Sequence, residues 1–351
     1  MIPTPSLHLA ATGSWFPATR PVHEAVTRGA LPAPWAATTG LRRVAICEPE
    51  HGPIAPEMAR EAGRLAVERA GRAHASYRRL LFVTTGFSGA EGWNAAAYLQ
   101  NEVLDGHGGA YEVRQLSNGA LTAIEAGDAW LAKAPPSSCV LVVAADRFSP
   151  PVWDRWRANR GFVFADGAAA VVLANDTGFA RVESIVSVSD TTLEAMQRGS
   201  NPLLTWSDPA DHPVRLYDRS QEFFDVMPPE EIRKRLQEGL IEACTRAAAE
   251  AGCSLSSVDH LVFPNFGRSL LREQCLEPLG LDIARTTWSW GAGIGHAGAV
   301  DQLAGLDHLV RERALRPGAR VALVGIGGGF NWTCLIAVVT DHPPAGPGPA
   351  G

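Results

Sequence analysis

Long hydrophobic runs are missing from this sequence. No stretch reaches about 18 consecutive apolar residues, the length that a membrane-spanning helix needs. The first residues, MIPTPS, also lack the charged start and the long apolar centre of a secretory signal. We therefore expect a cytoplasmic protein that has no membrane partner.

Cysteine is sparse, and an excess of positive charge is absent. The six cysteines show no C-x-x-C spacing, which predicts free thiols and neither a zinc cluster nor a disulfide framework; they are Cys47, Cys139, Cys244, Cys253, Cys275 and Cys334. The 37 acidic residues outnumber the 31 lysines and arginines, and the net charge is -6. This balance argues against a nucleic-acid partner, because proteins that bind such polyanions concentrate positive charge.

The sequence does contain a regular alternation of predicted strands and helices. With 351 residues and 46% hydrophobic content, the chain can bury a large core. Short β-rich runs predict strands at 80–85, 139–144, 170–173, 259–263, 320–325 and 331–340. Helices are predicted at 56–71, 119–133, 230–252 and 298–315. The pattern indicates an α/β fold, and the Pro/Gly-rich tail at 343–351 is predicted to be disordered.

A candidate nucleophile, Ser117, stands between a strand-like run and the helix predicted from Gly119. In such a turn the side chain is held at a helix N-terminus, where free N–H groups and the helix dipole favour developing negative charge. A serine that only caps the helix would show the same pattern. The surroundings half-match the G-x-S-x-G motif, but the order Ser117, His296, Asp301 differs from that of α/β-hydrolases.

An imidazole and a carboxylate lie close together near the C-terminus. His296 is in a glycine-flanked loop before a predicted helix, and Asp301 follows it. Within one continuous helix the two would lie about 140 degrees apart, so their pairing requires the loop. A surface histidine and an exposed first-turn aspartate are the alternative interpretation. Together with Ser117 and the glycine triplet at 327–329, this set of groups points to acyl transfer.

Several blocks of the sequence resemble the β-ketoacyl-acyl-carrier-protein synthase III (KAS III) family of the thiolase superfamily. They are residues 111–120, 160–161, 164–170 and 295–330. The resemblance implies a thiolase fold, a duplicated five-layer α-β-α-β-α arrangement. Its N-terminal half, 1–180, would carry the nucleophile, and its C-terminal half, 181–342, the histidine, the aspartate and the glycine turn. It also implies a homodimer that receives acyl groups from an acyl carrier protein or a coenzyme A thioester, without a cofactor or a metal.

The sequence departs from that family at its reactive positions. Family members usually have cysteine at the place of Ser117, a histidine near Pro264 and Asn265, and an asparagine at the place of His296. The usual histidine and asparagine stabilise the enolate that forms when a malonyl thioester loses carbon dioxide, so their replacement disfavours decarboxylative condensation. The altered set resembles the KAS III-like acyltransferases and priming ketosynthases of polyketide pathways that use serine, histidine and aspartate.

The resemblance assigns further residues to the site. The N–H groups of Gly328 and Ser117 would hold the oxyanion, and Asn265 is either a donor in the pocket or a cap for its turn. Trp35 and Arg160 lie near the positions of the family's coenzyme A contacts. An arginine usual in the family is replaced by Thr38, which makes a carrier-protein donor at least as plausible as coenzyme A.

These observations give one hypothesis and two alternatives. In the first, Ser117 takes an acyl group from a thioester with His296 as base and Asp301 as its orienting acid. The group then passes to a small-molecule acceptor, a hydroxyl of an intermediate in polyketide or other secondary metabolism. The alternatives are a priming ketosynthase that condenses a starter group with malonyl-carrier protein, and a non-catalytic partner subunit of a ketosynthase.

Overall fold

The computed structural model describes residues 6–48, 50–86, 88–90, 92–106, 108–200 and 212–344. Within these ranges nine strands form one hydrogen-bonded sheet. Its order is β5 (Gly109–Val113), β4 (Tyr77–Val83), β6 (Cys139–Asp146), β7 (Gly167–Ala174), β1 (His8–Trp15), β8 (Ala180–Ser189), β11 (Asn331–Val339), β10 (Arg320–Gly327) and β9 (His260–Val262). A separate pair, β2 (Thr19–Pro21) and β3 (Arg43–Ala45), lies near the chain's first helices.

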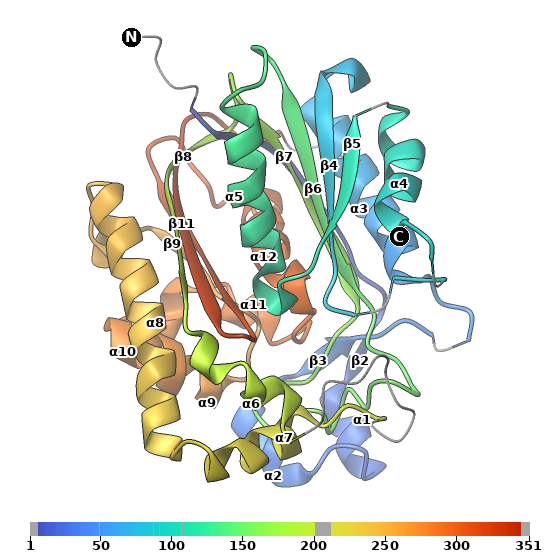
Figure 1. Ribbon diagram of the computed structural model, residues 1–351, viewed down its shortest axis with the longest axis vertical. Helices are drawn as coiled ribbons and strands as arrows, with labels where there is room; N and C mark the ends of the chain where they lie inside the picture. Colours follow the sequence, from blue (N-terminus) through green and yellow to red (C-terminus); the bar gives the residue numbers. More distant parts are fainter. Residues whose placement is uncertain are drawn as a thin grey trace.

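The large sheet consists of two groups of strands that meet at a narrow junction. The pairing of β1 with β8 includes only His8 with Arg181 and Leu9 with Ala180. Beyond that junction the two groups separate, and helices α5 (Gly119–Leu131) and α12 (Asp301–Arg311) lie between them (Figure 1). Each group therefore has one face toward the central helices and one face toward an outer helix.

The layers follow from where apolar side chains are buried. Helix α3 (Ala55–Ala70) packs on the outer face of the first group, against β1, β6 and β7. Helix α8 (Pro229–Glu250) packs on β8 and β11 of the second. Three hydrophobic clusters occupy the spaces under α3, around α5 and α12, and under α8. This is the five-layer arrangement of the thiolase fold, and that prediction is confirmed.

Most elements lie where the sequence predicts them. The helix predicted at 230–252 is α8, and the helix predicted at 298–315 is a 3-10 turn, Gly298–Val300, followed by α12. Strands β1 and β8 were not predicted, although they connect the two groups. We propose the boundary between the halves near residue 180, where β8 begins.

Two further expectations concern the C-terminal tail and membrane-spanning helices. The tail predicted at 343–351 lies outside the described residues from 345 onward. In the part of the chain that the structure describes, no helix is both long enough and apolar enough to cross a membrane.

Candidate active site

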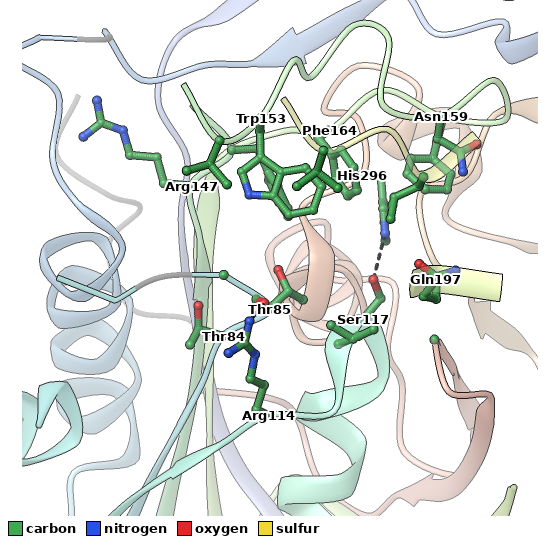
Figure 2. Close-up of a pocket in the computed structure, with 18 of the residues that line it drawn as sticks. Thr84, Thr85, Arg114, Ser117, Arg147, Trp153, Asn159, Phe164, Gln197 and His296 are labelled. Carbon is green, nitrogen blue, oxygen red and sulfur yellow. Dashed lines mark hydrogen bonds between the residues drawn. The ribbon is translucent and has the colours of Figure 1, made fainter. Parts of the chain in front are cut away.

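A cavity of about 1320 Å³ opens beside the N-terminal end of α5. Ser117 and His296 both line it, and Figure 2 shows their side chains facing each other. Ser117 Oγ lies 3.0 Å from His296 Nε2, although the two residues are far apart in the sequence. The fold therefore brings a hydroxyl from the first half against an imidazole from the second.

Local backbone geometry places the Ser117 hydroxyl at the cavity. Ser117 lies in a 3-10 turn, Leu116–Asn118, between β5 and α5. Leu116 has φ of 47°, a left-handed conformation that an L-residue adopts only when its surroundings hold it there. Gly119 begins α5, and a Cβ there would lie 2.5 Å from Val83. The absence of a side chain lets this helix start directly against β4, with Ser117 at its N-terminus.

His296 is fixed through its backbone and surrounded by aromatic rings. Its N–H donates to the Val163 carbonyl at 2.9 Å, and its carbonyl accepts from the Ala165 N–H at 2.8 Å. The rings of Phe162, Phe164 and Phe266 have centroids 4.7, 5.6 and 5.2 Å from the imidazole. The histidine is buried, with 1% of its surface exposed, so only its Nε2 edge faces the reactants.

Asp301, the first residue of α12, holds the other edge of this imidazole. Its Oδ2 lies 2.6 Å from His296 Nδ1 and accepts from the Asn265 N–H at 2.7 Å. Its Oδ1 accepts from the Ala297 N–H at 2.9 Å. The 3-10 turn before α12 provides the reversal that the spacing of histidine and aspartate required.

This geometry defines what the imidazole can do. An ionised carboxylate only accepts hydrogen bonds, so His296 Nδ1 carries the proton that is shared with Asp301. Nε2 is then the acceptor for the Ser117 hydroxyl. The arrangement is a hydroxyl activated by a base, and the base is oriented by a buried acid.

The expectation that Asn265 is a pocket donor is wrong. Its side-chain amide donates to Asp301 Oδ1 at 3.3 Å, and the residue is 2% exposed. The reason is that the turn after β9 places this amide against the Asp301 carboxylate, and Asn265 is not among the residues that line the cavity. Asn265 thus supports Asp301 and does not contact the space where reactants would bind.

The glycine triplet lies beside the nucleophile turn. A Cβ at Gly327 would lie 2.6 Å from the Gln115 carbonyl, so glycine is needed for this close approach. Gly328 lines the cavity next to Leu116, and its role as an oxyanion donor stays a prediction. Sequence reasoning missed Asn118, whose amide donates to Asn331 Oδ1 at 2.5 Å and Thr333 Oγ1 at 2.8 Å. These bonds join the Ser117 turn to the β10–β11 hairpin.

Trp35 and Arg160, the two residues expected to contact the acyl donor, lie together beside Tyr217 and are not themselves among the residues that line the cavity. Arg160 lies 5.8 Å from the Trp35 ring centroid and 5.0 Å from that of Tyr217. It also donates to the Tyr217 hydroxyl at 2.7 Å. Tyr217 lines the cavity and stands edge-on to Trp35. Sequence reasoning did not include Tyr217, because it lies in a segment with little periodic pattern.

A second buried carboxylate, Asp146, lies at the end of β6 and was also missed. Its Oδ1 accepts from the Thr84 hydroxyl at 3.0 Å and from the Thr85 N–H at 2.7 Å. Its Oδ2 accepts from the Ala299 N–H at 3.1 Å. Burial raises the pKa of Asp146 to about 6, although the hydrogen bonds from Thr85 act against that shift.

Among the residues that the structure describes, neither the cysteines nor metal-binding side chains form a competing site. The six cysteines are free thiols. Burial raises the pKa of Cys47 to about 12, and a hydrogen bond with Cys244 and burial raise that of Cys334. Neither is a thiolate nucleophile at neutral pH. Within the described ranges, no cluster of His, Cys, Asp or Glu side chains is arranged to hold a metal ion.

Comparisons with known proteins agree with the fold. Residues 111–191 match the 3-oxoacyl-[acyl-carrier-protein] synthase III family, and residues 248–339 match its C-terminal region. β-Ketoacyl-[acyl-carrier-protein] synthase III of Rhizorhabdus wittichii is 26% identical over 84% of this chain and 86% of its own. The same enzyme of Nitratidesulfovibrio vulgaris is 27% identical over 86% and 89%.

Solved structures extend the likeness to nearly the whole chain. ChlB3, described as an acyltransferase, is 33% identical, and the match covers 97% of this chain and 100% of ChlB3 with a TM-score of 0.91. The priming β-ketosynthase from the R1128 polyketide biosynthetic pathway is 20% identical, with a TM-score of 0.77 over 96% and 97% of the two chains. This chain therefore belongs to the KAS III-like family of the thiolase fold and is an enzyme of the acyltransferase type.

Proposed function

We propose that this enzyme takes an acyl group from a carrier-protein or coenzyme A thioester onto Ser117 and passes it to a hydroxyl acceptor. The observation that carries the proposal is the chain of hydrogen bonds from Ser117 through His296 to Asp301, 3.0 and 2.6 Å long. A serine hydroxyl is a weak nucleophile without a base, and this chain supplies one. The acceptor would be an intermediate of polyketide or other secondary metabolism.

The reaction would proceed in two matched half-reactions. His296 Nε2 takes the Ser117 proton while Oγ attacks the thioester carbonyl; the C–S bond breaks, and the leaving thiolate receives the proton. In the second half the acceptor hydroxyl gives its proton to Nε2 and attacks the serine ester, and Ser117 Oγ leaves and is reprotonated. The N–H groups of Gly328 and Ser117 would stabilise the oxyanion in both halves.

Transfer is favoured over decarboxylative condensation by what surrounds the reactive pair. Three phenylalanine rings surround His296, and the nearby amide of Asn265 is engaged by Asp301. Loss of a dedicated oxyanion donor costs about 3 to 4 kcal/mol in a barrier, or roughly two to three orders of magnitude in rate. Transfer from a serine ester to an alcohol also exchanges one oxygen ester for another, which is close to thermoneutral.

The assembly proposed for this enzyme is a homodimer. Strand β5 is at the edge of the large sheet and ends just before the Ser117 turn. Tyr111 on this strand is 44% exposed, and its ring lies 5.2 Å from that of Trp130, which is 36% exposed. An exposed edge strand with aromatic side chains is a surface that a second copy can cover.

The test is intact-protein mass spectrometry after incubation with a panel of acyl-pantetheine thioesters. The wild-type enzyme should gain the mass of one acyl group, and Ser117→Ala should gain none while keeping its folded state. An unchanged adduct on the variant would remove Ser117 from the mechanism.

The acylated enzyme is then given alcohols and, separately, malonyl-carrier protein. Carbon dioxide release with a β-ketoacyl product, and no ester from any alcohol, would reassign it as a priming ketosynthase.

A further inference from the structure

The cavity has an apolar arm that extends from Gly328 to the underside of α8. Its wall combines residues from α8, from β11 and its preceding turn, and from a π-helical turn at Arg272–Leu276; they are Leu236, Leu240, Gln274, Cys275, Phe330 and Trp332. Leu240, Cys275 and Trp332 are almost completely buried. The far end of the arm is therefore formed by buried residues of α8 and of β11, two elements that pack against each other.

One polar group stands out in this wall. The Oε1 atom of Gln274 is buried and accepts no hydrogen bond from any residue that the structure describes. An unpaired buried acceptor is costly, because it has lost its hydrogen bonds to water and gained none. Gln274 also lies in a π-helical turn, a distortion that is frequent at functional sites. Together these features point to a polar group of a ligand in this arm.

We infer that the arm binds an acyl group that carries a hydroxyl remote from its carbonyl, with Gln274 as the partner of that hydroxyl. A hydroxyl both donates and accepts, so it matches a side-chain amide in either of its two orientations. The aromatic faces of Phe330 and Trp332 suit the apolar part between the carbonyl and the hydroxyl. This inference rests on the proposed function, since it names the substrate class of the same site.

The position of the arm assigns it to the acyl group and not to the acceptor. Its entrance is at Gly328, beside Leu116 and thus next to the Ser117 turn that would hold the ester carbonyl. The side of the cavity at Tyr217, whose hydroxyl accepts from the exposed Arg160, is more open to solvent. A covalently held group can fill a closed arm, whereas a donor and an acceptor that exchange during the cycle need the open side.

Binding measured without chemistry provides the first test. The probes are non-hydrolysable acyl-pantetheine amides in a ladder of chain lengths, each ending either in a hydroxyl or in a methyl group. Their Kd values are measured by calorimetry with the Ser117→Ala protein. At one chain length the hydroxyl probe should bind roughly tenfold more tightly than its methyl partner. Equal Kd values at every length would overturn the inference, because they would show that nothing in the arm recognises a hydroxyl.

Two further variants in the same Ser117→Ala background identify the partner. Gln274→Leu should abolish the preference and raise the thermal stability of the unliganded protein, since it removes an unpaired buried acceptor. Gln237→Leu is the control, because that amide donates to the Glu273 carbonyl at 3.2 Å outside the cavity wall. It should keep the preference. A preference that survives Gln274→Leu would also overturn the inference.

The same ladder as thioesters separates this inference from the proposed function. If wild-type enzyme forms no acyl adduct but the amides show a preference that depends on Gln274, the proposed function fails and the hydroxyl site stands. If adducts form at equal rates from hydroxyl and methyl donors, and the amides show no preference, the proposed function stands and the hydroxyl site fails.

Discussion

Two buried carboxylates flank the candidate active site, and they differ in the groups that donate to them. Asp301 accepts from two backbone N–H groups and is paired with the imidazole of His296. Among the described residues, the donors to Asp146 are all neutral: they are the hydroxyls of Thr84 and Thr85 and backbone N–H groups, including that of Ala299. Both side chains are buried, so their different chemistry comes from their partners.

The comparison indicates different roles for the two acids. Asp301 supports proton transfer by His296, whereas Asp146 holds the surrounding segments in place. When His296 becomes positively charged, Asp301 can stabilise that charge directly. Asp146 has no such partner in the part of the chain that the structure describes, and burial raises its pKa to about 6. Its bonds instead connect the cavity-lining segment at Thr84 and Thr85 to the turn that precedes Asp301. Asp146 is therefore a positioning residue, one step removed from the reacting atoms.

The largest effect should come from Asp301→Asn. An amide in that place would stabilise the imidazolium poorly and, by donating to Nδ1, would favour the wrong tautomer of His296. Acyl-enzyme formation should therefore slow by about a hundredfold to ten-thousandfold. Rates are measured by quenched-flow mass spectrometry with one acyl-pantetheine thioester. Asp146→Asn is the matched control, and its rate of acyl-enzyme formation should fall much less. If both variants lost the same factor, the distinction between the two acids would be wrong.

The second prediction concerns pH and Asp146. Its pKa is raised from 3.8 to about 6 in the folded protein, so between these values the folded state binds more protons than the unfolded state. The free energy of unfolding should therefore fall as pH rises through this window, by about 3 kcal/mol for this group, and level off above it. The free energy of unfolding is measured with urea for wild type and Asp146→Asn from pH 4 to 8. The difference between the two proteins at each pH gives the contribution of the Asp146 carboxyl.

The Asp146→Asn variant should be less stable overall, because its amide nitrogen would face a backbone N–H or a hydroxyl that needs an acceptor. Its stability should nevertheless lack the decline between pH 4 and 6 that Asp146 causes. If the free energies of unfolding of the two proteins changed in parallel with pH, this carboxyl would not titrate in that window.

Local sequence pattern was enough for most of the fold. The strand and helix on either side of Ser117, and the long helix α8, follow from runs and periodicities of apolar residues. Strand β1 escaped because its sequence, HLAATGSW, is rich in small and polar residues that become buried only when α3 and β7 cover them. Its burial depends on the assembled layers, so the sequence of the strand itself shows little apolar pattern.

The site residues show the same distinction between what local sequence predicts and what depends on tertiary contacts. His296 and Asp301 are near in sequence, and the resemblance to KAS III associated them with Ser117. The Asp146 network has no such signal, since its donors come from residues 84–86 and from Ala299. Gln274 in the cavity arm also lies far in sequence from Ser117. Contacts of this kind depend on tertiary geometry, which neither spacing nor composition encodes.

The smallest effect, and the sharpest test of how Asp301 is held, should come from Asn265→Ala. The substitution removes the 3.3 Å bond from the side-chain amide but leaves the backbone N–H bond of 2.7 Å to the same carboxylate. Because the stronger contact remains, acyl transfer should slow only roughly threefold to tenfold. KM for the thioester should stay unchanged, since the amide lies behind Asp301 and outside the cavity wall. A loss as large as that of Asp301→Asn, with a raised KM, would instead mean that Asn265 contacts the reactants, which is one of the two roles that the sequence allows.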